Sequence, residues 1–396
     1  MSQYQPLASD VVMKMDNDYV MHTYGRLPIV LTRGEGARVY DADGNCYLDF
    51  VAGIAVNALG HCHPKVVEAI REQAGKLIHT SNLYYTQPQA ELAKLLVEAS
   101  DMKKAFFCNS GAEANEAAFK LARKAAKKNG QEKKTAIVAA EQSFHGRTFA
   151  AITATGQPKY QKSFLPLVPG FTYIPFNDSD ALKDHINDDT CAVILEPVQG
   201  ESGVHPANKE FLLTARELCT KFNAALIFDE VQTGLGRTGK LFAYQHFDVI
   251  PDIMTLAKAL GAGFPMGACL ACGEYADTFE PGDHASTFGG TPLACTAGIA
   301  AVNEIINNNW VENADKIGRY LRERLSELPD IKEIRGLGLM CAVDFNNTNS
   351  RDLAKKAMSK GLLMNPIGES TLRMVPPLII NESDVDEAIN ILLDCF

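Results

Sequence analysis

Short apolar runs without polar alternation recur along the middle of the chain and predict buried strands. They are "KAFFC" (104–108), "TAIVAA" (135–140), "CAVILE" (191–196) and "AALIFD" (224–229). Strands covered on both faces of a parallel sheet are apolar throughout, whereas half-exposed strands alternate with polar residues. We therefore expect these runs to be parallel strands of one central sheet.

Helical patterns lie between and after these runs. Apolar residues recur three or four positions apart in residues 112–128 and 209–222, and the first stretch ends in lysines followed by Gly130, a favourable helix terminus. Farther on, "WVENADKIGRYLRERLSEL" predicts a helix, "GLMCAVDF" a strand and the last dozen residues a short helix. Near the start, "ARVYDADGNCYLDF" predicts a hairpin that turns at Asp43-Gly44.

This order of elements predicts an α/β fold. We expect a large, doubly wound and mostly parallel sheet domain with a smaller α/β domain packed on it. Residues 61–295 would form the large domain, and an N-terminal segment (1–60) would join residues 296–396 in the small one. Active-site groups are then expected where the strands of the large sheet end.

Charge and cysteine content narrow the possible partners. A net charge of −10 over 396 residues argues against nucleic acids and anionic membranes, which bind basic surfaces. No apolar run is long enough to span a bilayer, and the first 20 residues resemble neither a signal nor a transit peptide. Ten dispersed cysteines predict reduced thiols and a cytoplasmic protein.

Three patterns resemble binding motifs, but their context favours structural roles. "GLGRTG" (234–239) fits a dinucleotide fingerprint, yet four residues separate it from the strand before it and no convincing helix follows. Cys269 and Cys272 form a C-x-x-C without a second pair, inside a strand-like stretch that points them to opposite faces. The histidines of "HCHP" (61–64) lack nearby acidic or thiol partners. We expect neither a metal nor a dinucleotide.

The segment "NSGAEANEAAFK" follows a predicted strand and offers a place for a phosphate. Ser110 can cap the next helix, and Glu113 completes an S-x-x-E capping box. Gly111 and Ala112 lack bulk, so an anion can approach the free N–H groups at the positive end of the helix. An ordinary capped helix would show the same pattern.

Two further residues stand at the ends of apolar runs. Asp229 ends a strand, with Gln232 shortly after it, and Lys258 closes "DIMTLAK". A structural salt bridge and a lysine that reaches the surface would explain each residue alone. Asp229, Lys258 and the candidate phosphate-binding turn at Gly111 together match the groups that bind pyridoxal phosphate. The lysine would bind the aldehyde as a Schiff base through an amine made neutral by burial, and the aspartate would keep the ring nitrogen protonated.

The ordered segments "NSGAEANEAAFKLAR", "FHGRT", "EPVQGESG", "FDEVQTGLGRTG", "TLAKALGAGFPMG" and "STFGGTPLAC" carry a family resemblance. Over residues 20–380 the chain resembles the class III, ornithine-type pyridoxal-phosphate aminotransferases. The resemblance implies the fold-type I, aspartate-aminotransferase-like architecture and a homodimer with shared active sites. It also implies that the cofactor is held by a set of matching residues: Ser110, Gly111, Ala112, Phe144, Asp229, Gln232, Lys258 and Thr287.

Individual roles follow from the same resemblance. Lys258 would carry the cofactor and move the proton, Asp229 would pair with the ring nitrogen, and Gln232 would contact the ring hydroxyl. Phe144 would stack on the ring, and Gly111 and Ala112 would bind the phosphate. Thr287 would reach the phosphate of the neighbouring subunit, with Ser286 near the neighbour's substrate.

Two arginines are candidates for the substrate carboxylates. Arg147 and Arg373 are local cations in an acidic protein, and the guanidinium fork suits a carboxylate. The resemblance implies that Arg373 binds the α-carboxylate of glutamate and 2-oxoglutarate, and that Glu201 covers it in the other half-reaction. A plain ion pair between Glu201 and Arg373 is the simpler interpretation, which the family role would contain.

The implied reaction moves the δ-amino group of N2-acetylornithine to 2-oxoglutarate and gives N-acetylglutamate 5-semialdehyde and glutamate, a step of arginine biosynthesis. Ornithine enzymes of the family carry a tyrosine where this chain has Ile54, and "HTSNLYYTQPQ" also matches the acetylornithine branch. Succinylornithine, N-succinyl-diaminopimelate, ornithine and 4-aminobutyrate stay open as donors, because apolar pockets discriminate only modestly between acyl chains.

Two other function classes share some of these features. An aminomutase of the glutamate-1-semialdehyde type shares the scaffold but needs no external keto acid, so Arg147 and the Arg373–Glu201 pair favour the transaminase. A non-catalytic binding role would tolerate loss of Lys258 or Asp229, and the chain retains both.

Overall fold

A seven-stranded sheet forms the centre of the molecule. The computed structural model describes residues 7–396. In spatial order the strands are β4 (Lys104–Cys108), β12 (Gly267–Ala271), β11 (Ile253–Leu256), β10 (Ala225–Asp229), β7 (Thr190–Leu195), β5 (Ala136–Ala140) and β6 (Phe171–Ile174). Each of the four apolar runs singled out in the sequence forms a strand whose bounds agree within one residue.

The expectation that the four runs are parallel strands of one central sheet is confirmed, although a further strand, β12, runs the other way between β11 and β4. β6, β5, β7, β10 and β11 run parallel, but β12 is antiparallel to both β11 and β4. A parallel strand needs a crossover of a dozen or more residues, usually a helix. Here the chain leaves β11 through one short 3-10 helix, Lys258–Gly261, and turns directly into β12.

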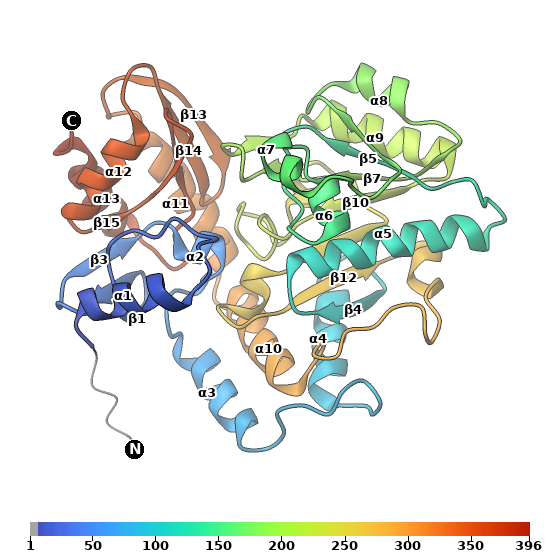
Figure 1. The fold of residues 1–396 in the computed structure, drawn as a ribbon, viewed down its shortest axis with the longest axis horizontal. Helices are drawn as coiled ribbons and strands as arrows, with labels where there is room; N and C mark the ends of the chain where they lie inside the picture. Colours follow the sequence, from blue (N-terminus) through green and yellow to red (C-terminus); the bar gives the residue numbers. More distant parts are fainter. Residues whose placement is uncertain (1–6) are drawn as a thin grey trace.

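Helices cover both faces of this sheet, so its side chains are apolar on both sides. α5 (Gly111–Lys128) packs on the face that carries Ile137 and Ala192, whereas α9 (Lys209–Phe222) packs on the face that carries Val138 and Val193. Figure 1 shows α5 and α9 on opposite sides of the strands. The other helices of this part are α3 (Pro64–Ala74), α4 (Gln87–Glu98), α6 (Phe149–Ala154), α7 (Pro158–Gln161) and α8 (Ser179–His185).

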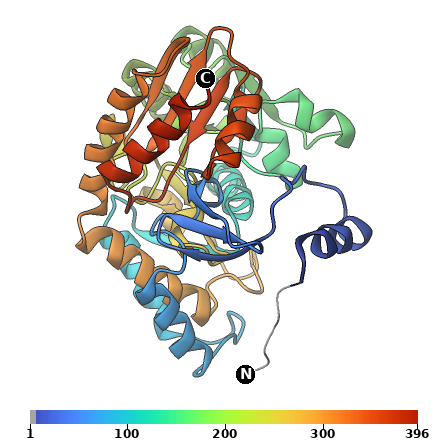
Figure 2. The ribbon, with the colours of Figure 1, turned by 90° about the vertical axis from the view of Figure 1, so that its left-hand side faces the viewer.

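The N-terminal hairpin lies beside the C-terminal part of the chain. β1 (Leu31–Glu35), β2 (Arg38–Asp41) and β3 (Cys46–Asp49) form a sheet with β15 (Leu362–Leu363), which runs parallel to β3. The hairpin predicted at Asp43-Gly44 is confirmed as the antiparallel pair β2–β3. In Figures 1 and 2 the blue N-terminal strands and the red C-terminal elements lie together.

A second small sheet and three helices complete this part. The sheet contains β13 (Ile331–Leu337), β14 (Met340–Phe345), β17 (Thr371–Met374) and β16 (Asn365–Ile367). The helices are α11 (Trp310–Leu325), α12 (Ser350–Ser359) and α13 (Glu382–Leu393). The helix before them, α10 (Pro292–Asn307), packs mainly against α3 and α4 of the large-sheet part. The division of the chain at residues 60 and 296 stays a prediction.

The remaining helices and strands are α1 (Ser9–Tyr19), α2 (Ala52–Ala55), β8 (Val198–Gln199) and β9 (His205–Pro206). Three further 3-10 helices span Lys162–Phe164, Ala243–His246 and Gly273–Asp277. α1 buries none of its residues, and Figure 2 shows it apart from the main body. Within residues 7–396 no helix combines the length and apolar character needed to cross a bilayer.

The three patterns interpreted as structural have defined places in the fold. In "GLGRTG", Arg237 is fully buried, and its guanidinium donates to the carbonyls of Leu339 and Pro376. In "HCHP", the expectation that the histidines lack acidic partners is wrong, because partners distant in the sequence approach them: His61 pairs with Asp49 at 2.8 Å and His63 lies 3.7 Å from Glu304. Cys269 is buried in β12 and Cys272 follows that strand half-buried.

Candidate active site

A cavity of about 450 Å³ opens where the parallel strands of the large sheet end. Nine of the residues singled out in the sequence line it, although they come from loops after five different strands: Ser110, Gly111, Ala112, Phe144, Arg147, Glu201, Asp229, Gln232 and Lys258. The strand ends of a doubly wound sheet converge on one edge, so residues distant in the sequence meet there.

Lys258 stands at the floor of the cavity, as the first residue of the 3-10 helix after β11. Its backbone has φ +45°, a left-handed conformation that costs free energy and is found where the surrounding structure enforces it. The residue is half-buried by surface area because it lines the cavity, whereas its amine lies deep. Burial lowers the pKa of that amine, with the charge of Glu201 opposing the shift. A larger fraction of the amine is therefore neutral and nucleophilic.

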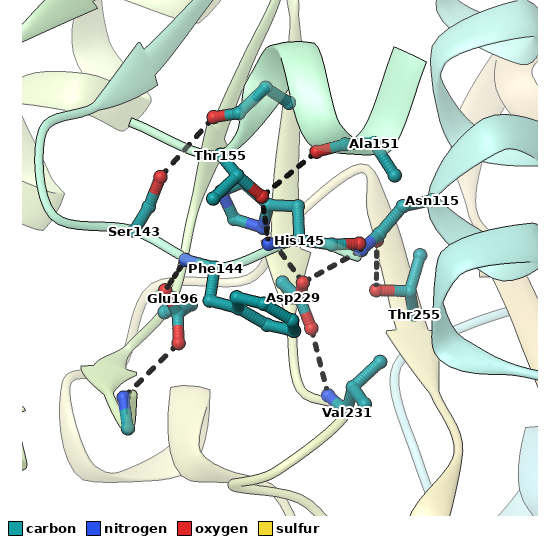
Figure 3. A network of polar contacts seen from close by, with 12 residues as sticks. Asn115, Ser143, Phe144, His145, Ala151, Thr155, Glu196, Asp229, Val231 and Thr255 are labelled. Atoms are coloured by element: carbon teal, nitrogen blue, oxygen red, sulfur yellow. Dashed lines mark hydrogen bonds and ion pairs between the residues drawn. The ribbon is translucent and has the colours of Figure 1, made fainter. Parts of the chain in front are cut away.

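Asp229 lies at the end of β10 with only 4% of its surface exposed. Its Oδ2 atom accepts from Asn115 Nδ2 and pairs with His145 Nδ1, both at 2.8 Å (Figure 3). Its Oδ1 atom accepts from the N–H of Val231 at 3.0 Å. Thr255 Oγ1 donates to Asn115 Oδ1 at 2.8 Å and thereby fixes the orientation of that amide. These donors hold the carboxylate in one orientation.

Sequence reasoning missed the three side chains of this network: Asn115, His145 and Thr255. Each lies in a segment that was selected for a different residue. A hydrogen bond between loops that are distant in the sequence produces no pattern in either segment. Only His145 could have been predicted as a site residue, because it directly follows Phe144 in "FHGRT".

The start of α5 forms a cradle with free backbone donors. Ser110 Oγ accepts from the N–H of Glu113 at 3.2 Å, so the predicted cap is present. The predicted capping box is wrong in one bond: Glu113 Oε2 accepts from the N–H of Asn109 rather than from that of Ser110.

Gly111 and Ala112 line the cavity at the positive end of this helix. A Cβ atom on Gly111 would lie 2.7 Å from Val231 Cγ1, so only glycine fits without a shift of the loop after β10. Among the described residues, neither the Gly111 nor the Ala112 N–H has a hydrogen-bond partner. Both are therefore available to an anion.

Glu201 and Arg373 form the predicted pair. Arg373, on β17, is almost fully buried, and its Nη1 atom lies 2.7 Å from Glu201 Oε1. Gln232 Nε2 donates to the same oxygen at 3.2 Å. Burial alone would raise the pKa of Glu201, but the charges of Arg373 and Lys258 hold it below its usual range. Of this pair only Glu201 lines the cavity. A substrate carboxylate in the cavity would therefore have to displace Glu201 to contact Arg373.

Arg147 and Phe144 stand at the mouth of the cavity. The guanidinium carbon of Arg147 lies 4.0 Å from the centre of the Tyr160 ring and 5.5 Å from that of Phe144. The Phe144 and Tyr160 rings meet edge to face at 5.9 Å. The exposed guanidinium thus stays close to the site and free for a carboxylate.

Ser286 and Thr287 do not line this cavity. They border a separate hollow of about 810 Å³, next to exposed residues of the segment 81–86. Ser286 Oγ accepts from Asn109 Nδ2 at 3.0 Å, and Asn109 in turn lines the first cavity. Their role toward a neighbouring subunit stays a prediction.

The residues of the cavity fit pyridoxal phosphate by their chemistry. Asp229 is an anchored anion suited to a protonated ring nitrogen, and Oδ1 accepts only from the Val231 N–H among the described residues. The free N–H groups of Gly111 and Ala112 suit a phosphate, and the Lys258 amine suits an aldehyde.

The family model for class III aminotransferases matches residues 19–396. The chain belongs to this family. Class III aminotransferases use pyridoxal phosphate, and their fold-type I architecture is the one predicted from the sequence.

Individual relatives agree with this assignment. The acetylornithine aminotransferase of Caldanaerobacter subterraneus is 54% identical over 96% of this chain and 97% of its own length. The ornithine aminotransferase of Toxoplasma gondii has a TM-score of 0.94 at 34% identity, covering 99% of this chain and 95% of that one. The acetylornithine aminotransferase of Elizabethkingia anophelis has a TM-score of 0.87 at 36% identity, covering 98% and 99%.

Proposed function

We propose that this aminotransferase moves the δ-amino group of N2-acetylornithine to 2-oxoglutarate, giving N-acetylglutamate 5-semialdehyde and glutamate. The observation that carries the reaction type is the ion pair of Arg373 and Glu201, 2.7 Å apart, whose Glu201 lines the same cavity as Lys258. The choice of donor is supported by the 54% identity to the Caldanaerobacter enzyme and by Ile54, where ornithine enzymes carry a tyrosine.

The protein groups divide the chemistry among them. Pyridoxal phosphate, when bound, supplies the electron sink that stabilises negative charge at the substrate carbon. Lys258 Nζ would hold the cofactor through its aldehyde and would serve as the base for the proton on the amine-bearing carbon of the donor, because burial lowers the pKa of this amine and leaves more of it neutral. Asp229, oriented by Asn115 and His145, faces the ring nitrogen as a fixed negative charge.

The further cofactor contacts are proposed from their places in the cavity. Gly111, Ala112 and the capped turn at Ser110 bind the phosphate, Phe144 packs against the ring, and Gln232 contacts the ring hydroxyl. These side chains orient the cofactor and exclude water from one face of it.

The arginines allow one cavity to accept two substrates. A donor that presents a terminal amine brings no carboxylate to Arg373, and Glu201 neutralises that arginine during its half-reaction. Glutamate brings an α-carboxylate, which takes the place of Glu201 in a bidentate pair with Arg373. Arg147, exposed at the mouth, binds the carboxylate at the far end of either substrate.

We propose a homodimer as the working form. Ser286 and Thr287 would then complete the partner's site, since they do not border the cavity of their own chain. Large apolar side chains near them are exposed, which supports a covered surface: Leu83, Tyr84, Tyr85 and Phe288. We assign the protein to the cytoplasm on its ten free thiols. Sedimentation analysis tests the dimer, and a monomer at micromolar concentration would contradict it.

The donor assignment is tested with single amino donors and no keto acid. N2-acetylornithine is expected to convert the absorbance of the bound cofactor faster than ornithine, succinylornithine, N-succinyl-diaminopimelate or 4-aminobutyrate. Ornithine is the second candidate, because the Toxoplasma enzyme has a TM-score of 0.94. A faster reaction with another donor would keep the chemistry and replace the substrate, whereas no reaction with any donor would refute the proposal.

A further inference from the structure

Glu196 joins two loops of the cavity through their backbones. It directly follows β7 and is 6% exposed. Its Oε1 atom accepts from the N–H of Phe144 at 2.9 Å, and its Oε2 atom accepts from the N–H of Gly200 at 3.2 Å (Figure 3). One loop carries the ring of Phe144, and the other carries Glu201 directly after Gly200. The Glu196 carboxylate therefore connects the loop that carries Phe144 with the loop that carries Glu201, the partner of Arg373.

The peptide of Gly200 has little freedom to move. Its carbonyl accepts from Arg373 Nη1 at 2.9 Å, the same nitrogen that pairs with Glu201. A Cβ atom at Gly200 would lie 2.3 Å from Gln232 Oε1, so the backbone approaches that side chain as only glycine can. A shift of the Gly200 N–H away from Glu196 would consequently displace the guanidinium of Arg373.

Both oxygens of Glu196 must accept for this bridge to exist. An ionised carboxylate has two acceptors, whereas a protonated one turns one oxygen into a donor. The charged groups that face Glu196 are His145, Asp229 and Lys258. Burial raises the pKa of Glu196 to about 7; the charge of His145 opposes this shift and that of Asp229 adds to it. The bridge is thus complete above neutral pH and loses one acceptor below it.

We propose that Glu196 is a positioning residue that sets the placement of the Glu201–Arg373 pair relative to Phe144, so that glutamate and 2-oxoglutarate bind well only while both of its oxygens accept. This inference rests on the proposed function, because it takes glutamate and 2-oxoglutarate as the substrates that use Arg373. It assigns Glu196 no contact with substrate or cofactor.

Glu196→Gln tests the bridge with almost no change of shape. The amide keeps one acceptor and places an NH2 group against a backbone N–H, so one charge-assisted hydrogen bond is lost. We expect the KM for 2-oxoglutarate and the Kd for glutamate to rise about tenfold. The KM for the amino donor should change less than twofold, since the donor does not use Arg373. An equal rise for both substrates would overturn the proposal.

A second readout follows the backbone without any turnover. In cofactor-free protein, amide hydrogen exchange should become faster at Phe144 and Gly200 in the variant, because both N–H groups lose or weaken their acceptor. The matched control is Glu141→Gln, which removes an exposed carboxylate at the end of the neighbouring strand β5 and leaves the bridge intact. Unchanged protection at both amides in Glu196→Gln would overturn the proposal.

The pH profile separates a bridge from a simple packing role. In the wild-type enzyme the KM for 2-oxoglutarate should rise as the pH falls below about 7, because Glu196 becomes protonated. In Glu196→Gln the KM should be high at every pH and flat across this range. A profile that keeps its wild-type shape in the variant would exclude titration of Glu196 as its cause and overturn the proposal.

If Glu196→Gln does not fold, a second variant, Glu196→Asp, tests the same proposal. Glu196→Asp keeps the charge but is one methylene shorter, so it reaches one of the two amides, and the same selective rise of KM is expected. Failure of the wild-type enzyme to react with glutamate would refute the proposed function. Hydrogen exchange at Phe144 and Gly200 would still decide the role of Glu196.

Discussion

Replacement of Glu201 by glutamine should make the enzyme bind glutamate more tightly and make the protein less stable. Glutamine has the same shape and still accepts from Arg373, but it carries no charge. Glutamate can reach Arg373 only by displacing the side chain at position 201, whose Oε1 lies 2.7 Å from the guanidinium. A side chain at position 201 that binds Arg373 more weakly is easier for glutamate to displace.

The magnitude follows from the hydrogen bonds that change. A hydrogen bond with an ionised partner contributes about 1.5–3 kcal/mol. Glutamine removes one of the two charges of the Arg373–Glu201 bond, while the guanidinium stays charged, so only a part of this contribution is lost. Glu201 accepts one such bond from Arg373, and both side chains are largely buried, so solvent screens the pair little. The part lost is about 1–2 kcal/mol, which corresponds to roughly 5- to 30-fold in glutamate affinity. The free energy of unfolding should fall by about the same amount.

Rapid mixing of glutamate with the cofactor-loaded enzyme measures this affinity through the absorbance of the bound cofactor, and urea unfolding of the same preparations measures the stability. The control is Glu217→Gln, which neutralises an exposed carboxylate on α9. An unchanged or weaker affinity for glutamate in Glu201→Gln would refute the view that Glu201 competes with the substrate for Arg373.

Three shorter tests concern other parts of the site. Lys258→Ala should lower turnover by more than about a thousandfold while the cofactor-free protein stays folded by circular dichroism; a variant that still transaminates would disprove the assignment. Arg373→Ala should impair the glutamate half-reaction more than the donor half-reaction in single-turnover measurements, and equal losses would contradict the exchange with Glu201. Ser110→Ala removes the acceptor of the Glu113 N–H and should lower the free energy of unfolding by about 1 kcal/mol in a denaturant titration; no loss would mean that water replaces the cap.

The sequence alone determined most of the secondary structure. The runs at 104–108 and 209–222 became β4 and α9 with unchanged bounds, because continuous apolar character and helical spacing report directly which faces are buried. The local pattern also identified Lys258, Asp229 and the turn at Gly111 as candidate site residues. Each stands where an apolar run ends, and a charged or very small residue at such a position indicates a specific role. The family resemblance then supplied the roles that local chemistry could not distinguish.

The tertiary structure decided which of these groups meet. The antiparallel course of β12 depends on the missing crossover helix, and only the folded turn before α5 shows that Glu113 accepts from the N–H of Asn109. His145 and Glu196 became part of the site only through hydrogen bonds between loops that lie far apart in the chain. Burial periodicity acts within one element, whereas the direction of a hydrogen bond and the pKa of a buried carboxylate depend on neighbours that only the packed fold brings together.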